Sequence, residues 1–330
     1  MPDLPQKMRI LEFEAPRRAV WKETELPRVE PDEVLIRVQG ITTCPHWDLH
    51  MMDGEPMFPG VALEYPLTPG QPGHEAVGDV VAVGKNVAEF SPGMCVAAWR
   101  DPGNRRMGLY AQYAPVRAED LIQVDPALSP EEIAPLELAM CVQGSFDLMR
   151  QRDAVEGKRM AIGGLGPSGL IAVQLARAHG ATRVIGLDPL SDRRQMALDL
   201  GADEVHDPGQ YSWPSGRENP NAFDSSLDTT GLPVAIEPLM NSTRETVAIF
   251  GVLRDQVRFG PEQWWGGFAL LGYATHTRAA AEEAYGLIMD GKLRLGPLVS
   301  ERLPFTRYAE GVEKLRTKDS IKVLFDPWAK

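Results

Sequence analysis

Residues 159–169, RMAIGGLGPSG, decide the fold of this chain. The apolar run at their start predicts a short β-strand over residues 159–162. Gly164, Gly166 and Gly169 then match the pattern G-x-G-x-x-G at the opening of a helix. The first glycine allows a tight turn, the second lets a pyrophosphate approach the backbone, and the third lets helix and strand pack closely. A glycine-rich turn in another kind of α/β protein is the alternative, but the strand–turn–helix context favours a dinucleotide-binding loop.

An acidic residue follows this loop at the distance that ribose recognition requires. Asp188 ends the next predicted strand, 183–187, about 20 residues after the last glycine. Its carboxylate can accept hydrogen bonds from the ribose hydroxyls and would repel a 2′-phosphate, which predicts NAD rather than NADP. Arg193 and Arg194 could soften that preference, but we expect them to face solvent at the start of a helix. The predicted cofactor-binding residues are Gly164, Leu165, Gly166, Pro167, Ser168, Gly169, Asp188 and Arg193.

Strands and helices alternate on either side of this unit. Helical patterns cover residues 170–179 and 193–200, and further strands are expected at 226–227, 247–250 and 269–271. Such alternation predicts a doubly wound parallel sheet with helices on both faces, the Rossmann arrangement.

The first third of the chain has a different pattern. Residues 33–39 and 77–83 read as strands, proline and glycine cluster at 66–73, and helical periodicity is nearly absent before residue 130. Ser129, followed by a proline and two glutamates, is typical of a helix start. Helical spacing returns at 279–289 and 308–315, and a last strand at 321–325 could rejoin the first domain. We therefore predict a β-rich domain over 1–145, rejoined by 285–330, and a Rossmann domain over 146–284.

Composition narrows the function classes. The chain has 330 residues, of which 43% are hydrophobic and 24% charged, as in an ordinary globular protein, and its formal net charge is −12. Such an acidic chain makes nucleic acid and anionic membranes poor partners, and no apolar run is long enough for a membrane span. Three scattered cysteines form no disulfide framework, and the first residues lack an apolar signal core. A cytoplasmic protein is expected.

A second motif lies in the first domain. Gly73-His74-Glu75-Ala76-Val77-Gly78, followed by Gly84, has the form G-H-E-x-x-G-x-x-x-x-x-G. This segment resembles the zinc signature of the medium-chain alcohol and polyol dehydrogenases of the sorbitol and threonine dehydrogenase type. In that family a GroES-like catalytic domain precedes and follows a Rossmann domain, which is the order predicted above. The resemblance covers nearly the whole chain.

The resemblance implies a catalytic zinc and names its ligands. His74 corresponds to the zinc-binding histidine, and Glu75 to the glutamate close behind it, which is either an outer neighbour of the metal or an alternative ligand. Cys44 corresponds to the first ligand and Asp48 to the aspartate that orients it. The family spacing is C-x-x-D, whereas Asp48 is the fourth residue after Cys44, so we expect the loop to bulge around an intact Cys44 ligand. His46 is the spare ligand if it does not.

A third ligand should open the helix that leads into the cofactor domain. Glu137 stands where relatives of the sorbitol type carry an acidic ligand, and a buried carboxylate needs a partner such as a metal. Cys141 is the alternative, although a buried free cysteine more often packs as a small hydrophobe. The second, structural zinc of many relatives needs four thiolates, and residues 99–113 contain no cysteine. One catalytic zinc and no structural zinc are therefore expected.

The implied reaction is hydride transfer between a secondary alcohol (a polyol, sugar, cyclitol or related carbinol) and NAD, with zinc as the Lewis acid. In the family a hydroxyl group and often a histidine carry the proton away; His50 has the position of that histidine, but Trp47 replaces the hydroxyl residue. The predicted catalytic residues are Cys44, Asp48, His50, His74 and Glu75. Trp47, Trp264 and Trp265 could line the substrate pocket, or the last two could pack at a subunit contact. Relatives are commonly homodimers or homotetramers.

Two other functions are possible for the same architecture. A metal-free member of the fold would reduce an enone or quinone with NADPH, but it would not need Cys44, His74, Glu75 and Glu137. A nucleotide-sensing or lens-type binding protein would have kept the fold and lost turnover. The shifted Cys44–Asp48 spacing and Trp47 are its only support.

Overall fold

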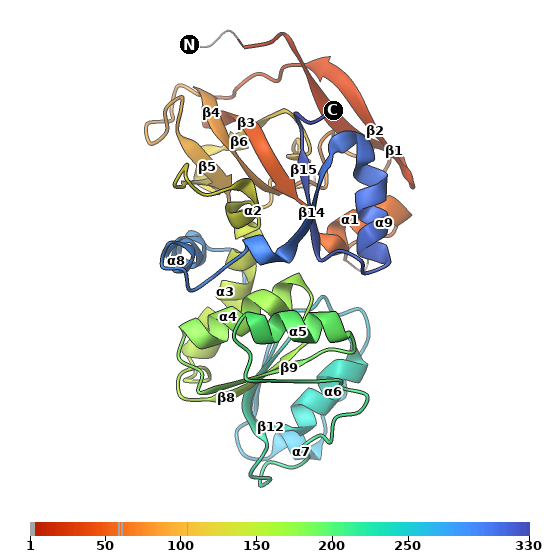
Figure 1. Ribbon diagram of the computed structural model, residues 1–330, viewed down its shortest axis with the longest axis vertical. Coiled ribbons are helices and arrows are strands. Elements are labelled where there is room, and N and C mark those ends of the chain that lie inside the picture. Colours follow the sequence, from red (N-terminus) through yellow and green to blue (C-terminus); the bar gives the residue numbers. More distant parts are fainter. Residues whose placement is uncertain (1–3, 59, 61, 104) are drawn as a thin grey trace. The chain divides into compact units, whose positions relative to one another are not determined.

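The computed structural model describes residues 4–58, 60, 62–103 and 105–330 (Figure 1). The chain divides into two compact units, Met1–Leu138 with Leu295–Lys330, and Ala139–Arg294. The boundaries therefore lie at 138 and 295 rather than at the expected 145 and 285. Arg150 near the end of the connecting helix pairs with Glu283 on a later helix, at 2.7 Å, so both helices belong mainly to the second unit.

The first unit is built on a mostly antiparallel sheet, as predicted. Within the described residues this sheet has seven strands, six of them in the order β14-β15-β3-β4-β5-β7, while β6 pairs with β3 and a separate hairpin joins β1 to β2. The last strand returns antiparallel to β3, which confirms that the C-terminus rejoins the first domain. The strands are β1 (Lys7–Ala15), β2 (Arg18–Glu25), β3 (Glu33–Thr42), β4 (Glu75–Val83), β5 (Cys95–Ala98), β6 (Tyr113–Arg117), β7 (Leu121–Gln123), β14 (Val299–Pro304) and β15 (Lys322–Asp326).

The α-helices that lie wholly among the described residues of this unit are short: α1 (Pro45–Asp53), α2 (Pro130–Ile133) and α9 (Tyr308–Arg316). Helix α2 begins at Ser129 as predicted, where a capping box joins the Ser129 N–H to the Glu132 carboxylate at 2.8 Å. Helix α1 was not predicted and lies in the part of the chain where helical periodicity is nearly absent. It has Pro45 in its first turn and ends at Gly54, whose φ of 77° suits glycine.

The second unit is the predicted Rossmann domain. Its parallel sheet has the order β10-β9-β8-β11-β12-β13 within the described residues. The strands are β8 (Arg159–Gly163), β9 (Arg183–Leu187), β10 (Glu204–His206), β11 (Phe223–Asp228), β12 (Thr243–Ile249) and β13 (Ala269–Leu271). The helices are α3 (Leu136–Arg150), α4 (Pro167–Ala178), α5 (Ser191–Asp199), α6 (Pro233–Asn241), α7 (Pro261–Trp264) and α8 (Arg278–Met289).

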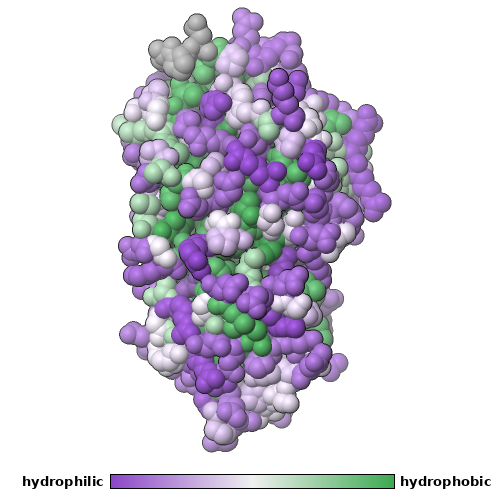
Figure 2. Space-filling model, viewed as in Figure 1, coloured by the Kyte–Doolittle hydropathy of each residue, from purple (hydrophilic) through white to green (hydrophobic). Residues whose placement is uncertain are grey.

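The centre of the parallel sheet of the second unit is buried on both of its faces. The central strand β8 of the second unit is almost wholly buried because helices cover both faces of a parallel sheet. Hydrophilic residues dominate the face drawn in Figure 2, where apolar residues form small groups, in keeping with the net charge of −12. No helix in the described part of the chain has both the length and the apolar character to cross a bilayer.

Candidate metal and dinucleotide sites

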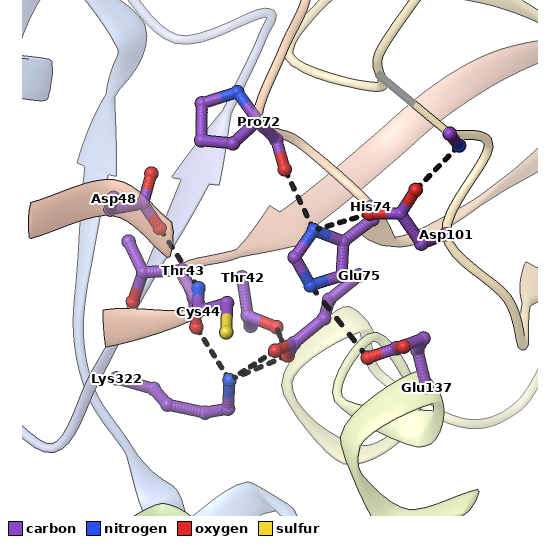
Figure 3. A network of polar contacts seen from close by, with 11 residues as sticks. Thr42, Thr43, Cys44, Asp48, Pro72, His74, Glu75, Asp101, Glu137 and Lys322 are labelled. Atoms are coloured by element: carbon purple, nitrogen blue, oxygen red, sulfur yellow. Dashed lines mark hydrogen bonds and ion pairs between the residues drawn. The ribbon is translucent and has the colours of Figure 1, made fainter. Parts of the chain in front are cut away.

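Four potential metal ligands of the first unit lie together, although they are far apart in the sequence. Cys44 follows β3, His74 and Glu75 stand at the start of β4, and Glu137 lies in the first turn of α3. The ligand atoms of Cys44, His74 and Glu75 all lie within 4.8 Å of one another. The Glu137 carboxylate is 3.7 Å from Nε2 of His74 (Figure 3). Thiolate, imidazole and carboxylate are the donors that zinc prefers, so these residues fit that metal.

His74 is oriented by the chain that precedes it. Its Nδ1 lies 2.7 Å from the carbonyl oxygen of Pro72, a bond that requires a proton on Nδ1 and leaves the lone pair of the neutral ring on Nε2. Asp101 is a second neighbour of Nδ1, at 3.7 Å (Figure 3). Burial opposes protonation of this ring, but the Glu137 carboxylate and the Cys44 sulfur raise the pKa of His74 well above its usual value. A pocket that attracts a proton in this way also suits a divalent cation.

Cys44 is fixed by a helical turn rather than by the bulge that we expected. It is the residue before α1, and the N–H of Asp48 donates to its carbonyl at 2.9 Å, the one-turn spacing of a helix. The Asp48 carboxylate accepts the Cys44 N–H in return, also at 2.9 Å. The expected bulge is therefore wrong, because four-residue spacing is what a helix needs to bring the aspartate back to the cysteine. Burial raises the pKa of the Cys44 thiol.

Two tyrosines that the sequence analysis missed hold Asp48. The hydroxyls of Tyr110 and Tyr308 donate to its Oδ1 at 2.7 and 2.5 Å. Burial raises the pKa of Asp48 to about 6, although these hydrogen bonds act in the opposite direction. All three side chains are nearly inaccessible to solvent. Asp48 is therefore a buried carboxylate whose partners are phenols and a backbone N–H.

Glu75 has a partner that the sequence analysis also missed. Nζ of Lys322 lies 2.7 and 2.5 Å from its two carboxylate oxygens, and the Thr42 hydroxyl donates to one of them at 2.7 Å. Lys322 and Glu75 are completely buried. Glu75 thus lies beside Cys44 and His74 and is at the same time part of an ion pair.

The other predicted residues of this region lie on α1. The ring of Trp47 is 6.2 Å from that of His74, so this tryptophan borders the ligand cluster. The ring of His50 stacks on that of His46 at 5.7 Å, and its Nδ1 is 3.6 Å from a carboxylate oxygen of Glu55. Among the described residues, the donor group around Cys44 and His74 does not include the spare ligand His46. Cys141, the alternative to Glu137, lies further along α3 and belongs to the second unit.

The glycine loop of the second unit has the geometry that its sequence predicts. Gly164 has a φ of 84°, and a Cβ on Gly169 would lie 1.9 Å from the Gly164 carbonyl oxygen. No atom would come within 4 Å of a Cβ on Gly166, which leaves room above the loop for a ligand. One oxygen of Asp188 accepts the Leu165 N–H at 2.8 Å, so the carboxylate lies directly beside the loop.

Arg193 and two tryptophans of the second unit differ in how far they are buried. Arg193 does not face solvent: it is only 9% exposed, and burial lowers its pKa while the Asp188 carboxylate opposes that shift. Trp264 and Trp265 are 73% and 71% exposed, so neither is packed in the core.

The comparisons with known proteins agree with this architecture. Residues 30–126 match the family model of the alcohol dehydrogenase GroES-like domain, and residues 167–285 match that of the zinc-binding dehydrogenase. An alcohol dehydrogenase of Geobacillus stearothermophilus is 31% identical over 313 residues, 83% of this chain and 86% of that one. L-threonine 3-dehydrogenase of Pyrococcus horikoshii is 28% identical over 334 residues, 92% and 93% of the two chains. D-arabinitol dehydrogenase 1 of Uromyces fabae is 25% identical, with 98% of each chain covered.

Solved structures share the fold. That of galactitol-1-phosphate dehydrogenase from Escherichia coli has a TM-score of 0.85 at 23% identity and covers 97% of this chain and 100% of its own. Fold, donor cluster and relatives together define the class, an oxidoreductase that acts on CH–OH groups. Within that class the chain belongs to the zinc-type, medium-chain alcohol and polyol dehydrogenase family, as its sequence motifs predicted. Nothing in these matches favours the metal-free enone or quinone reductase.

Proposed function

We propose that this chain transfers a hydride between a secondary alcohol of the polyol, sugar or cyclitol type and NAD, with one zinc ion at the cluster of the first unit. The observation that carries this proposal is the convergence of Cys44, His74 and Glu137, three residues of zinc-binding type, in one buried place. Relatives named for D-arabinitol, L-galactonate and L-threonine support a hydroxylated substrate.

Cys44, His74 through Nε2, and Glu137 would hold the zinc, and Glu75 stands behind them. A zinc ion there supplies Lewis-acid chemistry to an alcohol oxygen. The chain contributes the orientation of its ligands: the Pro72 carbonyl fixes the His74 ring, and Asp48 fixes the backbone of Cys44. Trp47 gives the cluster an apolar border that helps to exclude water. His50 is the residue that we propose to hold the released proton, and its neighbour Glu55 stabilises the charged ring.

Asp188 supports NAD as the cofactor. Each of its oxygens accepts one backbone N–H, from Leu165 and Leu190, at 2.8 Å. Because a carboxylate oxygen has two acceptor sites, both oxygens retain capacity for a ribose hydroxyl. The buried Arg193 beside this carboxylate leaves room for some use of NADP, whose 2′-phosphate an arginine can accommodate.

The outer edge of the Rossmann sheet supports assembly into a homodimer or homotetramer. Strand β13 is last in the strand order of the described residues. Leu270 and Tyr273 at this strand are exposed, and so are the nearby Trp264 and Trp265. Pairing of β13 with a second copy would cover these groups. The free cysteines Cys44, Cys95 and Cys141 fit a reducing compartment such as the cytoplasm.

The proposal is tested on the purified protein by metal analysis and turnover. We expect one zinc per chain, and NADH formation when NAD and a panel of polyols, sugars and cyclitols are added. Removal of zinc with a chelator should abolish turnover, and added zinc should restore it. A protein that reduces enones with NADPH while free of metal would establish the reductase instead, and one that binds NAD without turnover of any alcohol would be a binding protein.

A further inference from the structure

A lysine from the last strand is buried beside the proposed zinc ligands. Lys322 is 0% exposed, which lysine almost never is unless it is paired. Its Nζ lies 2.7 and 2.5 Å from the two oxygens of Glu75 and 2.5 Å from the carbonyl oxygen of Thr43 (Figure 3). An ammonium group has three protons, so these acceptors use its full donor capacity.

The position of this lysine is set by the backbone. Lys322 is the first residue of β15, and the next residue exchanges hydrogen bonds with Thr43: the Val323 N–H donates to Oγ1 at 3.0 Å, and its carbonyl accepts the Thr43 N–H at 2.9 Å. Thr43 precedes the ligand Cys44. The strand that returns from the C-terminus therefore fixes both the lysine and the start of the ligand loop.

Glu75 is close enough to the cluster to become a ligand itself. One of its oxygens lies within 4.8 Å of both Cys44 Sγ and a ring nitrogen of His74. Its carboxylate is instead held by Lys322 on both oxygens and by the Thr42 hydroxyl on one. A catalytic zinc has three protein ligands and one open position, whereas a fourth protein ligand gives a closed, structural site.

Charge favours the same arrangement. A thiolate and two carboxylates carry three negative charges, which a divalent cation alone does not balance. The ammonium of Lys322 supplies the missing positive charge, so the buried set is neutral when the metal is present. Without the lysine, the Glu75 carboxylate would have only the metal as a cationic partner in this buried place.

We propose that Lys322 is a positioning residue that holds Glu75 away from the metal and so keeps one coordination position open for the substrate. This inference rests on the proposed function, because it assumes a zinc bound by Cys44, His74 and Glu137. It gives the last strand of the fold a role in the chemistry: the C-terminal return supplies the residue that keeps the site catalytic rather than structural.

The test compares Lys322→Met with the double variant Lys322→Met/Glu75→Gln. We expect Lys322→Met to bind zinc about tenfold more tightly, because Glu75 becomes a fourth ligand. A factor of about ten is at the lower end of the changes in metal affinity seen when a residue that contacts a metal ligand is substituted. In the cobalt-substituted protein, the visible spectrum of the wild type should change when azide is added, and that of Lys322→Met should not. The double variant has no carboxylate at position 75 and should respond to azide as the wild type does.

Each outcome decides the matter. A Lys322→Met protein that responds to azide and binds zinc no more tightly overturns the inference, and so does a double variant that fails to respond. If Lys322→Met does not fold, Lys322→Gln replaces it: its neutral amide can donate to one Glu75 oxygen at most and supplies no positive charge, so Glu75 should still turn to the metal, and the same two opposed outcomes apply. A wild type that binds neither zinc nor cobalt would instead contradict the proposed function, so the two failures are distinguishable.

Discussion

The two candidate sites of this protein are built in opposite ways. The zinc cluster is made of charged and polar side chains that come from residues 44 to 322 of the chain. The dinucleotide loop, residues 163–169, is formed by backbone atoms and depends on glycines, which have no side chain. The cluster is therefore sensitive to charge and hydrogen bonding, whereas the loop is sensitive to volume.

The contrast is visible in single atoms. In the cluster, Glu75 and Asp48 are buried carboxylates that each accept three hydrogen bonds. Those to Glu75 come from Lys322 and Thr42, and those to Asp48 come from two distant tyrosines and the nearby Cys44 N–H. In the loop, a single methyl group at Gly169 would stand 1.9 Å from a carbonyl oxygen. Substitutions should therefore separate the two sites by their effects on metal binding, dinucleotide binding and folding.

The largest effect is expected from His74→Ala. Loss of this ligand should lower zinc affinity by more than the about 10–100-fold that loss of an outer partner costs, and alcohol oxidation should disappear with the metal. NAD affinity should change little, since the glycine loop is left intact. Metal analysis and NAD titration by fluorescence measure the two effects separately. His46→Ala is the matched control, because this exposed histidine lies outside the donor group; loss of zinc in His46→Ala would make His46 the ligand after all.

The loop allows a similar separation between two of its glycines. Gly169→Ala should destabilise the fold by about 1–3 kcal/mol or more, because its Cβ would overlap the Gly164 carbonyl. Gly166→Ala should leave the melting temperature unchanged, since its φ is −69° and nothing lies within 4 Å of the added atom. It should nevertheless weaken NAD binding at least about tenfold, or 1.4 kcal/mol, because the methyl group occupies the approach of the pyrophosphate. Equal losses of stability in both variants would contradict this division.

Asp48 should make folding stability depend on pH. Burial raises its pKa to about 6, whereas the unfolded value is near 3.8. Between these values the folded chain keeps a proton that the unfolded chain has released, so stability is lost as the pH rises from about 4 to about 6. The expected loss is on the order of 3 kcal/mol. Thermal melts of the metal-free protein across this range, compared with Asp48→Asn, isolate the effect; a difference between the two proteins that does not vary with pH would refute it.

The contrast between a local loop and a cluster of distant side chains also explains how far the sequence could predict each site. The glycine loop and Asp188 are local, so the motif alone placed them, and the limits of β9 and β13 agree with the expected 183–187 and 269–271. His74 and Glu137 were predicted as zinc ligands because their motif and helix position resemble those of a known family. Tyr110, Tyr308 and Lys322 were missed since nothing near them in the chain marks them. Their roles exist only when the fold brings them to Asp48 and Glu75.

Helix α1 and Arg193 were misjudged for related reasons. Over nine residues α1 buries only Asp48, Met51 and Met52, so it lacks a continuous apolar stripe that periodicity could reveal. Arg193 begins a helix with polar neighbours, which is the pattern of an exposed residue. Its burial, and the influence of the Asp188 charge on its pKa, arise from tertiary structure.

The smallest effect is expected where a charge touches the cluster only from outside. Asp101 lies 3.7 Å from Nδ1 of His74, but that nitrogen already donates to the Pro72 carbonyl at 2.7 Å. Asp101→Asn can keep the hydrogen bond from the Gly103 N–H, so the loop should retain its shape while the charge is lost. Because the carboxylate is partly exposed and its field is screened, zinc affinity should fall only about threefold, less than the 10–100-fold typical of a direct partner.

Zinc competition with a chromogenic chelator at low and high salt measures this effect, and Glu119→Gln, which removes an exposed charge elsewhere in the same unit, is the control. A loss of tenfold or more in Asp101→Asn would mean that the carboxylate, not the Pro72 carbonyl, orients His74. The segment around Asp101 has no cysteine to bind a structural zinc, and in that case it would itself be part of the catalytic cluster. The zinc affinity of the cluster would then depend on charges beyond its direct hydrogen bonds.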